Sequence, residues 1–291
     1  MENSVFATVL LPVALFVIMT GLGLSLTVGD FKRVWQFPRG VALGLANLLV
    51  ISPLLGFGIA TLLGLPPELG VGMVLLAASP GGTTANLLTH LARGDTALSV
   101  TLTAISSVAA VVITPLYLAL SWRHFMGGEA GVALPMGPIV LRVLLITLLP
   151  LAFGMGLRAR FPGFAARAEP WVKRLALLFF IGVVFGALIE ARHEIAQYFA
   201  AAGLATLLLN VAAMSLSWWM SRAARLDHRQ STAIAIELGV HNTTLAMAVA
   251  ALLASLSPLL IVPAAVYGVL MFFTAGAFAA LVHRRNQQPA G

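Results

Sequence analysis

The sequence predicts an all-α, polytopic membrane protein with nine transmembrane helices. Of its 291 residues, 60% are hydrophobic and only 9% are charged. A soluble domain has roughly 45–50% apolar and 25% charged residues, so soluble and disordered chains are both excluded. The apolar residues also form continuous runs, each close to the roughly 20 residues that a helix needs to cross a bilayer. There is no cysteine, which excludes disulfides and thiolate chemistry.

Short polar or Pro/Gly segments separate the apolar runs and set the order of the elements. We expect spans near 5–28, 39–63, 68–92, 96–121, 137–157, 173–189, 197–221, 230–255 and 258–282. The first run follows Met1–Ser4, which carries no basic residue, and it is longer than the apolar region of a signal peptide, so we expect a span there. The whole chain, 1–291, is thus expected to be one membrane domain.

The basic residues give the expected topology. Of 17 basic residues, 14 fall on alternate loops of one side: Lys32, Arg33, Arg39, Arg93, Arg158, Arg160, Arg167, Lys173, Arg174, Arg222, Arg225, Arg229, Arg284 and Arg285. Arg123 and Arg192 fall on the other side, and Arg142 sits near the outer end of the fifth span. The positive-inside rule predicts an outside N-terminus and a cytoplasmic C-terminus in a bacterial inner membrane. The net charge of +7 is therefore a topology signal, and nucleic acid is not an expected partner.

The third and fourth spans hold the first polar cluster. At mid-depth the third span reads Ser79-Pro80-Gly81-Gly82-Thr83-Thr84-Ala85-Asn86. Proline removes a backbone donor and glycine favours non-helical backbone, so the helix is expected to break here. A break at membrane depth is tolerated only where it is buried in protein or lines a wet cavity. Asp95 is expected to cap the start of the fourth span.

The seventh and eighth spans hold the second cluster. The eighth span reads Glu237-Leu238-Gly239-Val240-His241-Asn242-Thr243-Thr244 at mid-depth. Glu237 is the only one of ten acidic residues deep within a span, and an intramembrane carboxylate indicates a functional site. Asn210, in the middle of the seventh span, is expected to hydrogen-bond across neighbouring helices.

The two interrupted spans lie five spans apart, so their helices cross the membrane in opposite directions. Two broken helices at corresponding places of inverted halves are typical of the binding site of a secondary transporter. The free ends of the half-helices then present amide groups to an anion and carbonyl groups to a cation.

These residues resemble the bile acid:sodium symporter family. The matching motifs are Pro80-Gly81-Gly82-Thr83, Asn86, Leu91-Ala92-Arg93-Gly94-Asp95, Ala97-Leu98-Ser99-Val100, Glu237-Leu238-Gly239 and Asn242. The resemblance extends over essentially the whole chain. It implies a panel of the helices near 5–28, 137–157 and 173–189, with the other six forming a core in which the third and eighth spans cross. It further implies alternating access and sodium-coupled uptake of an organic anion.

The resemblance implies a sodium site at Asn86, Ser99, Thr103 and Glu237. Ser99 and Thr103 are four residues apart and share one helix face, and oxygen ligands suit Na⁺. Ala85 departs from the family, which often has Ser there. The family's second site does not carry over, because its two glutamines correspond to Leu48 and His241, and Asn47 points about 100° away from Leu48 on a regular helix. We therefore expect one sodium, with His241 filling the altered second site as a neutral hydrogen-bonding group or, if protonated, by its charge.

The expected substrate is an organic anion, either bile-acid-like or a small carboxylate. By resemblance its ligands are Thr83, Thr84, Asn242, Thr243 and Thr244, together with Met271 from the ninth span. Helix N-termini bind carboxylates through free amides. The expected assembly is a monomer or a weak oligomer.

Three other functions compete with this prediction. An enzyme is not expected, because the sequence has no Gly-x-Ser-x-Gly motif and no P-loop, and the string that starts at His193-Glu194 has Gln197 where a zinc protease needs histidine. A non-transporting sensor or a channel would bind the ligand without accumulating it. A proton-coupled carrier would use Glu237 and His241.

Overall fold

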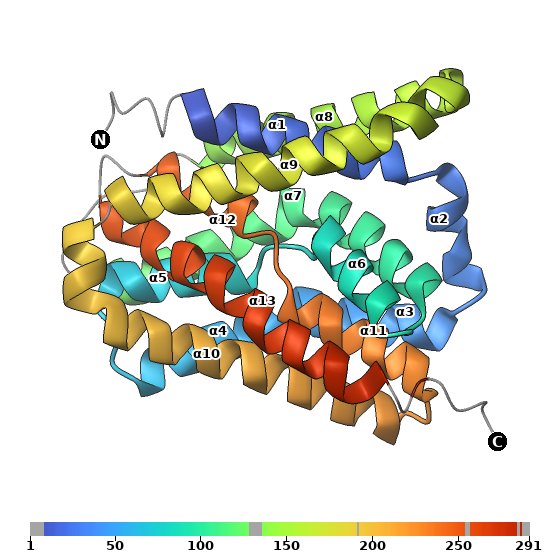
Figure 1. Ribbon diagram of the computed structural model, residues 1–291. Coiled ribbons are helices and arrows are strands. Elements are labelled where there is room, and N and C mark those ends of the chain that lie inside the picture. The colour runs from blue at the N-terminus through green and yellow to red at the C-terminus, as the bar shows by residue number, and fades with distance from the viewer. Residues whose placement is uncertain (1–8, 128–135, 191, 254–256, 284–285, 287–291) are drawn as a thin grey trace.

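In the computed structural model, helices form every regular element of the described residues (Figure 1). These are residues 9–127, 136–190, 192–253, 257–283 and 286. The expected positions 5–8, 254–255, Arg284 and Arg285 lie outside them. The all-helical expectation is confirmed for this part of the chain.

The helices follow the predicted runs in order. Their bounds are α1 Leu11–Ser25, α2 Val28–Lys32, α3 Pro38–Ala46, α4 Ser52–Leu62, α5 Pro67–Ala77, α6 Thr83–Leu91, α7 Thr96–Met126, α8 Met136–Arg160, α9 Pro162–Glu190, α10 Arg192–Ala223, α11 His228–Gly239, α12 Thr243–Ala251 and α13 Val262–His283. Short turns connect some of them: η2 Arg33–Trp35, η3 Asn47–Ile51 and η4 Pro258–Ile261. Each predicted run therefore contains one helix or a series of consecutive helical pieces.

Within the described residues, five helices are long and apolar enough to cross a membrane. They are Pro38–Leu62, Thr96–Met126, Met136–Arg160, Ala200–Ala223 and Leu259–His283. A sixth candidate is the pair Leu11–Ser25 and Val28–Trp35, whose axes are bent by 71°. Nine spans therefore stays a prediction.

Two local features differ from the expected regular helices. Helix α9 begins at Pro162, well before the predicted start at 173, because a proline at the first turn and the alanines that follow it favour a helix. Asn47–Ile51 form a π-helical turn, so the argument that placed Asn47 on a regular helix is wrong. The turn lies just before Pro53, whose ring nitrogen has no hydrogen to donate, and proline commonly distorts a helix in this way.

Both polar clusters interrupt their helices. The chain leaves helical conformation between α5 and α6, and again between α11 and α12. Gly82 at the start of α6 is extended, with φ −125° and ψ 170°. Val240 at the end of α11 is neither helical nor extended, with φ −131° and ψ 84°. The Pro-Gly-Gly sequence explains the first break. The second break contains no proline, so its conformation depends on the contacts described below.

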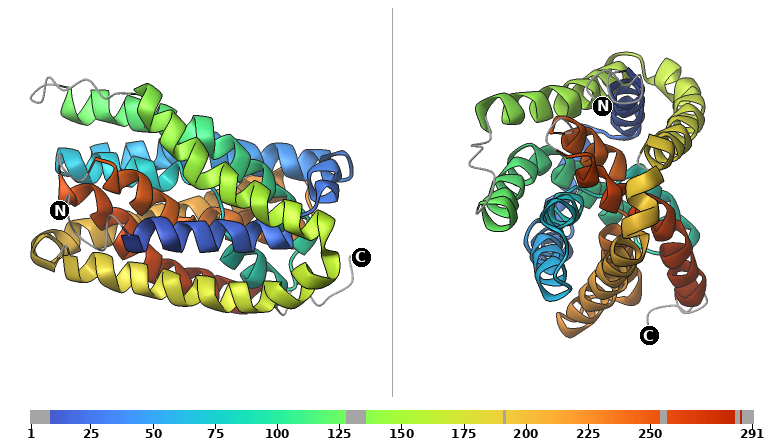
Figure 2. Two further views of the ribbon diagram at one scale, coloured as in Figure 1. Left: turned by 90° about the horizontal axis from the view of Figure 1, so that it is seen from above. Right: turned by 90° about the vertical axis from the view of Figure 1, so that its left-hand side faces the viewer.

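Helices α1, α8 and α9 gather on one side of the molecule. In Figure 1 they lie along the top, and in the end-on view of Figure 2 they again lie together above the rest. Helix α1 packs against both α8 and α9. The remaining helices surround the two breaks, where α11 contacts α6 and α7.

Candidate functional site

The two breaks cross and pair through their backbones. Gly81 and His241 form an antiparallel bridge, and the Asn242 N–H donates to the Pro80 carbonyl at 2.8 Å. The Thr114 hydroxyl of α7 donates to the carbonyl of Ala78 at 3.1 Å. The N–H and C=O groups that lose their helical hydrogen bonds at one break are thus partly paired with those of the other break. Unpaired backbone groups are costly in a low-dielectric interior, so this pairing stabilises the crossing.

The carbonyl end of α11 is held from two neighbouring helices. The Asn210 side-chain amide of α10 donates to the Gly239 carbonyl at 2.8 Å and to the Tyr267 hydroxyl at 2.9 Å. The Tyr267 hydroxyl of α13 donates to the same carbonyl at 3.1 Å. The expectation that Asn210 hydrogen-bonds across helices is confirmed.

Two helix N-termini meet at the crossing. Helix α6 begins at Thr83 and α12 at Thr243, and the Asn242 side chain caps α12 by accepting from the Leu245 N–H at 3.0 Å. First-turn amides and the positive end of the helix dipole favour an anion. The wall of the crossing therefore has anion-binding character.

An oxygen cluster lies behind this wall. The Ser99 hydroxyl is 2.8 Å from Asn86 Oδ1 and 2.6 Å from Glu237 Oε1. The Thr103 hydroxyl is 3.2 Å from Asn86 Oδ1 and 2.7 Å from Glu237 Oε1. The structure thus brings together, from α6, α7 and α11, all four residues expected at the first sodium site. Asp95 caps α7 as predicted, accepting from the Leu98 N–H at 3.0 Å.

The electrostatics of this cluster favour a cation. Glu237 is fully buried, its Oε2 has no hydrogen-bond partner, and none of the ion pairs found among the described residues includes it. A buried carboxylate without a counter-charge is costly. Gly81 packs directly against Oε2, where a Cβ would collide with it. A monovalent cation with oxygen ligands would supply the missing charge.

His241 lies at the crossing but is engaged by the protein itself. Its Nδ1 is 2.9 Å from the Ser79 carbonyl, so Nδ1 carries a hydrogen, and its Nε2 is 3.2 Å from the Ser52 hydroxyl. Leu48, at the other position of the family's second site, is buried in an apolar cluster. Asn47 is buried beside it in the chain, and neither atom of its amide has a partner. The two positions that the resemblance assigns to a second sodium site thus hold an apolar side chain and a histidine that is hydrogen-bonded within the protein.

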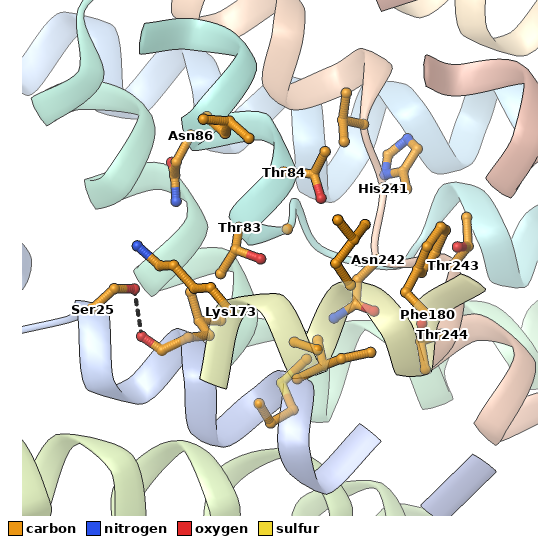
Figure 3. A pocket seen from close by; sticks show the side chains of 18 of the residues that line it. Ser25, Thr83, Thr84, Asn86, Lys173, Phe180, His241, Asn242, Thr243 and Thr244 are labelled. Atoms are coloured by element: carbon orange, nitrogen blue, oxygen red, sulfur yellow. Dashed lines mark hydrogen bonds between the residues drawn. The ribbon is translucent and has the colours of Figure 1, made fainter. Parts of the chain in front are cut away.

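A cavity of about 670 Å³ opens beside the crossing (Figure 3). All six residues expected to bind substrate line it: Thr83, Thr84, Asn242, Thr243, Thr244 and Met271. Phe272 also lines it, whereas Phe273 is 73% exposed on the outside. The cavity thus has a polar wall at the crossing and apolar walls contributed by other helices.

Sequence reasoning missed three residues of this region. Ser52 contacts His241, and Tyr267 supports Gly239; both are isolated polar side chains within apolar runs, which was the available signal. Lys173 was interpreted only as a topology residue, yet it lines the cavity together with Glu169. Its position depends on the packing of α9, which the sequence alone does not reveal.

The fold and the site define a class of protein, the helical membrane transporters whose ligands bind where interrupted helices meet. Residues 12–198 match the model of the Sodium Bile acid symporter family, which is more than half of the chain. The chain belongs to this family. The family comprises transporters rather than enzymes.

Named relatives agree with the assignment. The chain is 32% identical over 253 residues to an uncharacterized sodium-dependent transporter YocS of Bacillus subtilis, covering 87% of this chain and 76% of the relative. It is 31% identical over 285 residues to a probable sodium/metabolite cotransporter BASS2 of rice chloroplasts, covering 96% and 65%. It is 26% identical over 245 residues to the human ileal sodium/bile acid cotransporter, covering 83% and 69%. The chain thus spans about two thirds to three quarters of these relatives.

Proposed function

We propose that the chain is a sodium-coupled symporter that takes up an organic anion by alternating access across a bacterial inner membrane. The observation that carries the proposal is the placement of a buried, unpaired carboxylate, Glu237, directly behind the backbone crossing whose other side lines a cavity. A cation behind the crossing and an anion in front of it would stabilise the same backbone arrangement. By linkage, each would raise the affinity for the other equally.

The proposed sodium ligands are Asn86, Ser99, Thr103 and Glu237. The proposed anion site consists of Thr83, Thr84, Asn242, Thr243 and Thr244, with Met271 on the apolar side. One sodium is proposed, because Leu48 offers no ligand and His241 is hydrogen-bonded to Ser79 and Ser52. His241 occupies the altered second site either as a neutral hydrogen-bonding group or as a charged one.

The proposed architecture is nine spans in one membrane domain, arranged as inverted repeats. The grouping of α1, α8 and α9 supports a panel near 5–28, 137–157 and 173–189, and the helices around the crossing would form the core. The N-terminus would lie outside and the C-terminus in the cytoplasm. The protein would work as a monomer or a weak oligomer, with lipid, sodium and the anion as its partners.

The test is reconstitution into liposomes with a panel of carboxylates, including pyruvate, pantoate and taurocholate. We expect one or more of them to raise the melting temperature only in sodium and to accumulate when a sodium gradient is imposed. Accumulation that follows a proton gradient without sodium would instead favour the proton-coupled carrier that uses Glu237 and His241. Binding without accumulation would favour a sensor, and an ionic conductance would favour a channel.

A further inference from the structure

The mouth of the cavity carries a cluster of charges that the proposed transport cycle does not yet use. Helix α9 contributes Glu169, Lys173 and Arg174 to the lining, whereas the anion-binding wall comes from α6 and α12. Figure 3 shows Lys173 extending from α9, with its ammonium group between Ser25 of α1 and Asn86 of α6 in this view. A cation from one group of helices thus faces the polar wall of the other across the cavity.

The charge balance leaves this cation partly free. Glu169 Oε1 accepts from Lys173 Nζ at 2.6 Å, and Glu169 Oε2 accepts from Arg158 at 3.1 Å. The single carboxylate of Glu169 therefore pairs with two cations, so Glu169, Lys173 and Arg158 together carry a net charge of one positive unit. Arg158 is further held by the Leu24 carbonyl at 2.6 Å. Arg158 is thus bound within the α1–α8–α9 group, and the net positive charge of the three residues lies beside the cavity that Lys173 and Glu169 line.

Lys173 is also available to a ligand. Its side chain is 48% exposed, against 22% for Glu169, and only one of its three donors has a partner among the described residues. Arg174 differs, because its guanidinium lies over the Trp171 ring, 4.9 Å from the ring centroid. A cation at the edge of a cavity with apolar walls attracts an anion more strongly than one on an open surface.

We infer that Lys173 is a second anion-binding point, so that the preferred substrate has two acidic groups. One group would bind at the amides of the crossing and the other at Lys173, with the carbon chain against Met271 and Phe272. This inference rests on the proposed function and adds the substrate class to it. It also makes the substrate a bridge between α9 and the crossing helices.

The test compares paired probes of equal carbon number: succinate with butyrate, adipate with hexanoate, and suberate with octanoate. Dissociation constants are measured in sodium by thermal shift on the full-length protein in lipid nanodiscs. We expect at least one dicarboxylate to bind about fivefold more tightly than its partner, as suits one partly exposed charge pair. Lys173→Met should abolish this preference and Lys173→Arg should keep it.

Two further variants separate binding from structure. Glu169→Gln removes the competing carboxylate, so the dicarboxylate preference should increase. Arg167→Gln removes an equal charge from the same helix outside the cavity lining, and it should leave the preference unchanged. If the contact between Lys173 and Glu169 only stabilised α9, then Lys173→Met and Glu169→Gln would break the same contact and would change the dicarboxylate preference in the same direction.

The outcomes also separate this inference from the proposed function. If the wild type binds monocarboxylates in sodium without preferring dicarboxylates, or if Lys173→Met retains the preference, the inference is overturned and the symporter proposal stands. If neither this set nor the larger carboxylate panel binds in sodium, the proposed function fails, and the inference fails with it.

Discussion

Glu237 is the residue on which the proposed mechanism depends most. Its carboxylate is fully buried, receives hydrogen bonds from Ser99 and Thr103 through Oε1 only, and leaves Oε2 unpaired. A group in this state binds a cation readily, because the cation removes an uncompensated buried charge. Neutralising the carboxylate should therefore remove the negative charge that attracts sodium, while the Ser99 and Thr103 hydroxyls can still hydrogen-bond to the side chain.

The first prediction concerns this carboxylate. Glu237→Gln should weaken sodium binding at least tenfold, which is about 1.4 kcal/mol, and should remove sodium-dependent binding of the anion. The measurement is a sodium titration of the melting temperature at constant ionic strength, with choline replacing sodium. Glu68→Gln is the matched control, because Glu68 lies in the first turn of α5, away from the oxygen cluster. Unchanged sodium dependence in Glu237→Gln would show that the site is assigned wrongly.

At the scale of the element, the informative feature is the pair of interrupted helices. Each break alone would leave backbone groups unpaired, and the Gly81–His241 bridge and the bond from Asn242 to Pro80 pair some of them across the crossing. Gly81 is required because a side chain there would strike the Glu237 carboxylate. The neighbouring Gly82 has open space on its Cβ side.

Two adjacent glycines therefore give the second prediction. Gly81→Ala should lower the free energy of unfolding by about 1–3 kcal/mol, as overpacking of a close contact does, and should impair sodium binding by displacing Glu237. Gly82→Ala has a compatible backbone, with φ −125°, and should leave both quantities nearly unchanged. Chemical denaturation and sodium titration of the two variants provide the measurements. Equal effects at both positions would contradict the close packing of Gly81 against Glu237.

At the scale of the whole molecule, the question is which ends face which side of the membrane. Helices α3 and α4 form one apolar rod, Pro38–Leu62, with Trp35 before it and Leu62 at its far end. Under the positive-inside rule, the basic residues near Trp35 predict that this end lies in the cytoplasm. The opposite end should then be reached only from outside the cell.

The third prediction uses the absence of native cysteine. Trp35→Cys and Leu62→Cys are matched probes, because both side chains are 86% exposed. In intact cells, a membrane-impermeant maleimide should label Leu62→Cys at once and Trp35→Cys only after permeabilisation. The reverse pattern would invert the proposed topology and would turn the mouth of the cavity, with Lys173, toward the outside.

The sequence alone determined the membrane character, the order of the helices and the two interruptions. Low charge, continuous apolar runs and Pro-Gly-Gly act locally, so their consequences are visible in the chain. The sequence also singled out Glu237, because one carboxylate among apolar residues has few structural explanations. The residues expected at the sodium and anion sites followed from the family motifs.

Tertiary structure decided what the two interruptions do for each other. Only packing brings Asn86, Ser99, Thr103 and Glu237 together from three helices, and only packing shows that Glu237 Oε2 has no partner. The bond from Asn210 to the Gly239 carbonyl likewise joins residues 29 positions apart on two helices, and only the folded chain identifies this partner. The position of Lys173 at the cavity also follows from the packing of α9 and not from its neighbours in the sequence. Contacts between distant segments leave no periodic signal in a sequence, which is why these features required the folded chain.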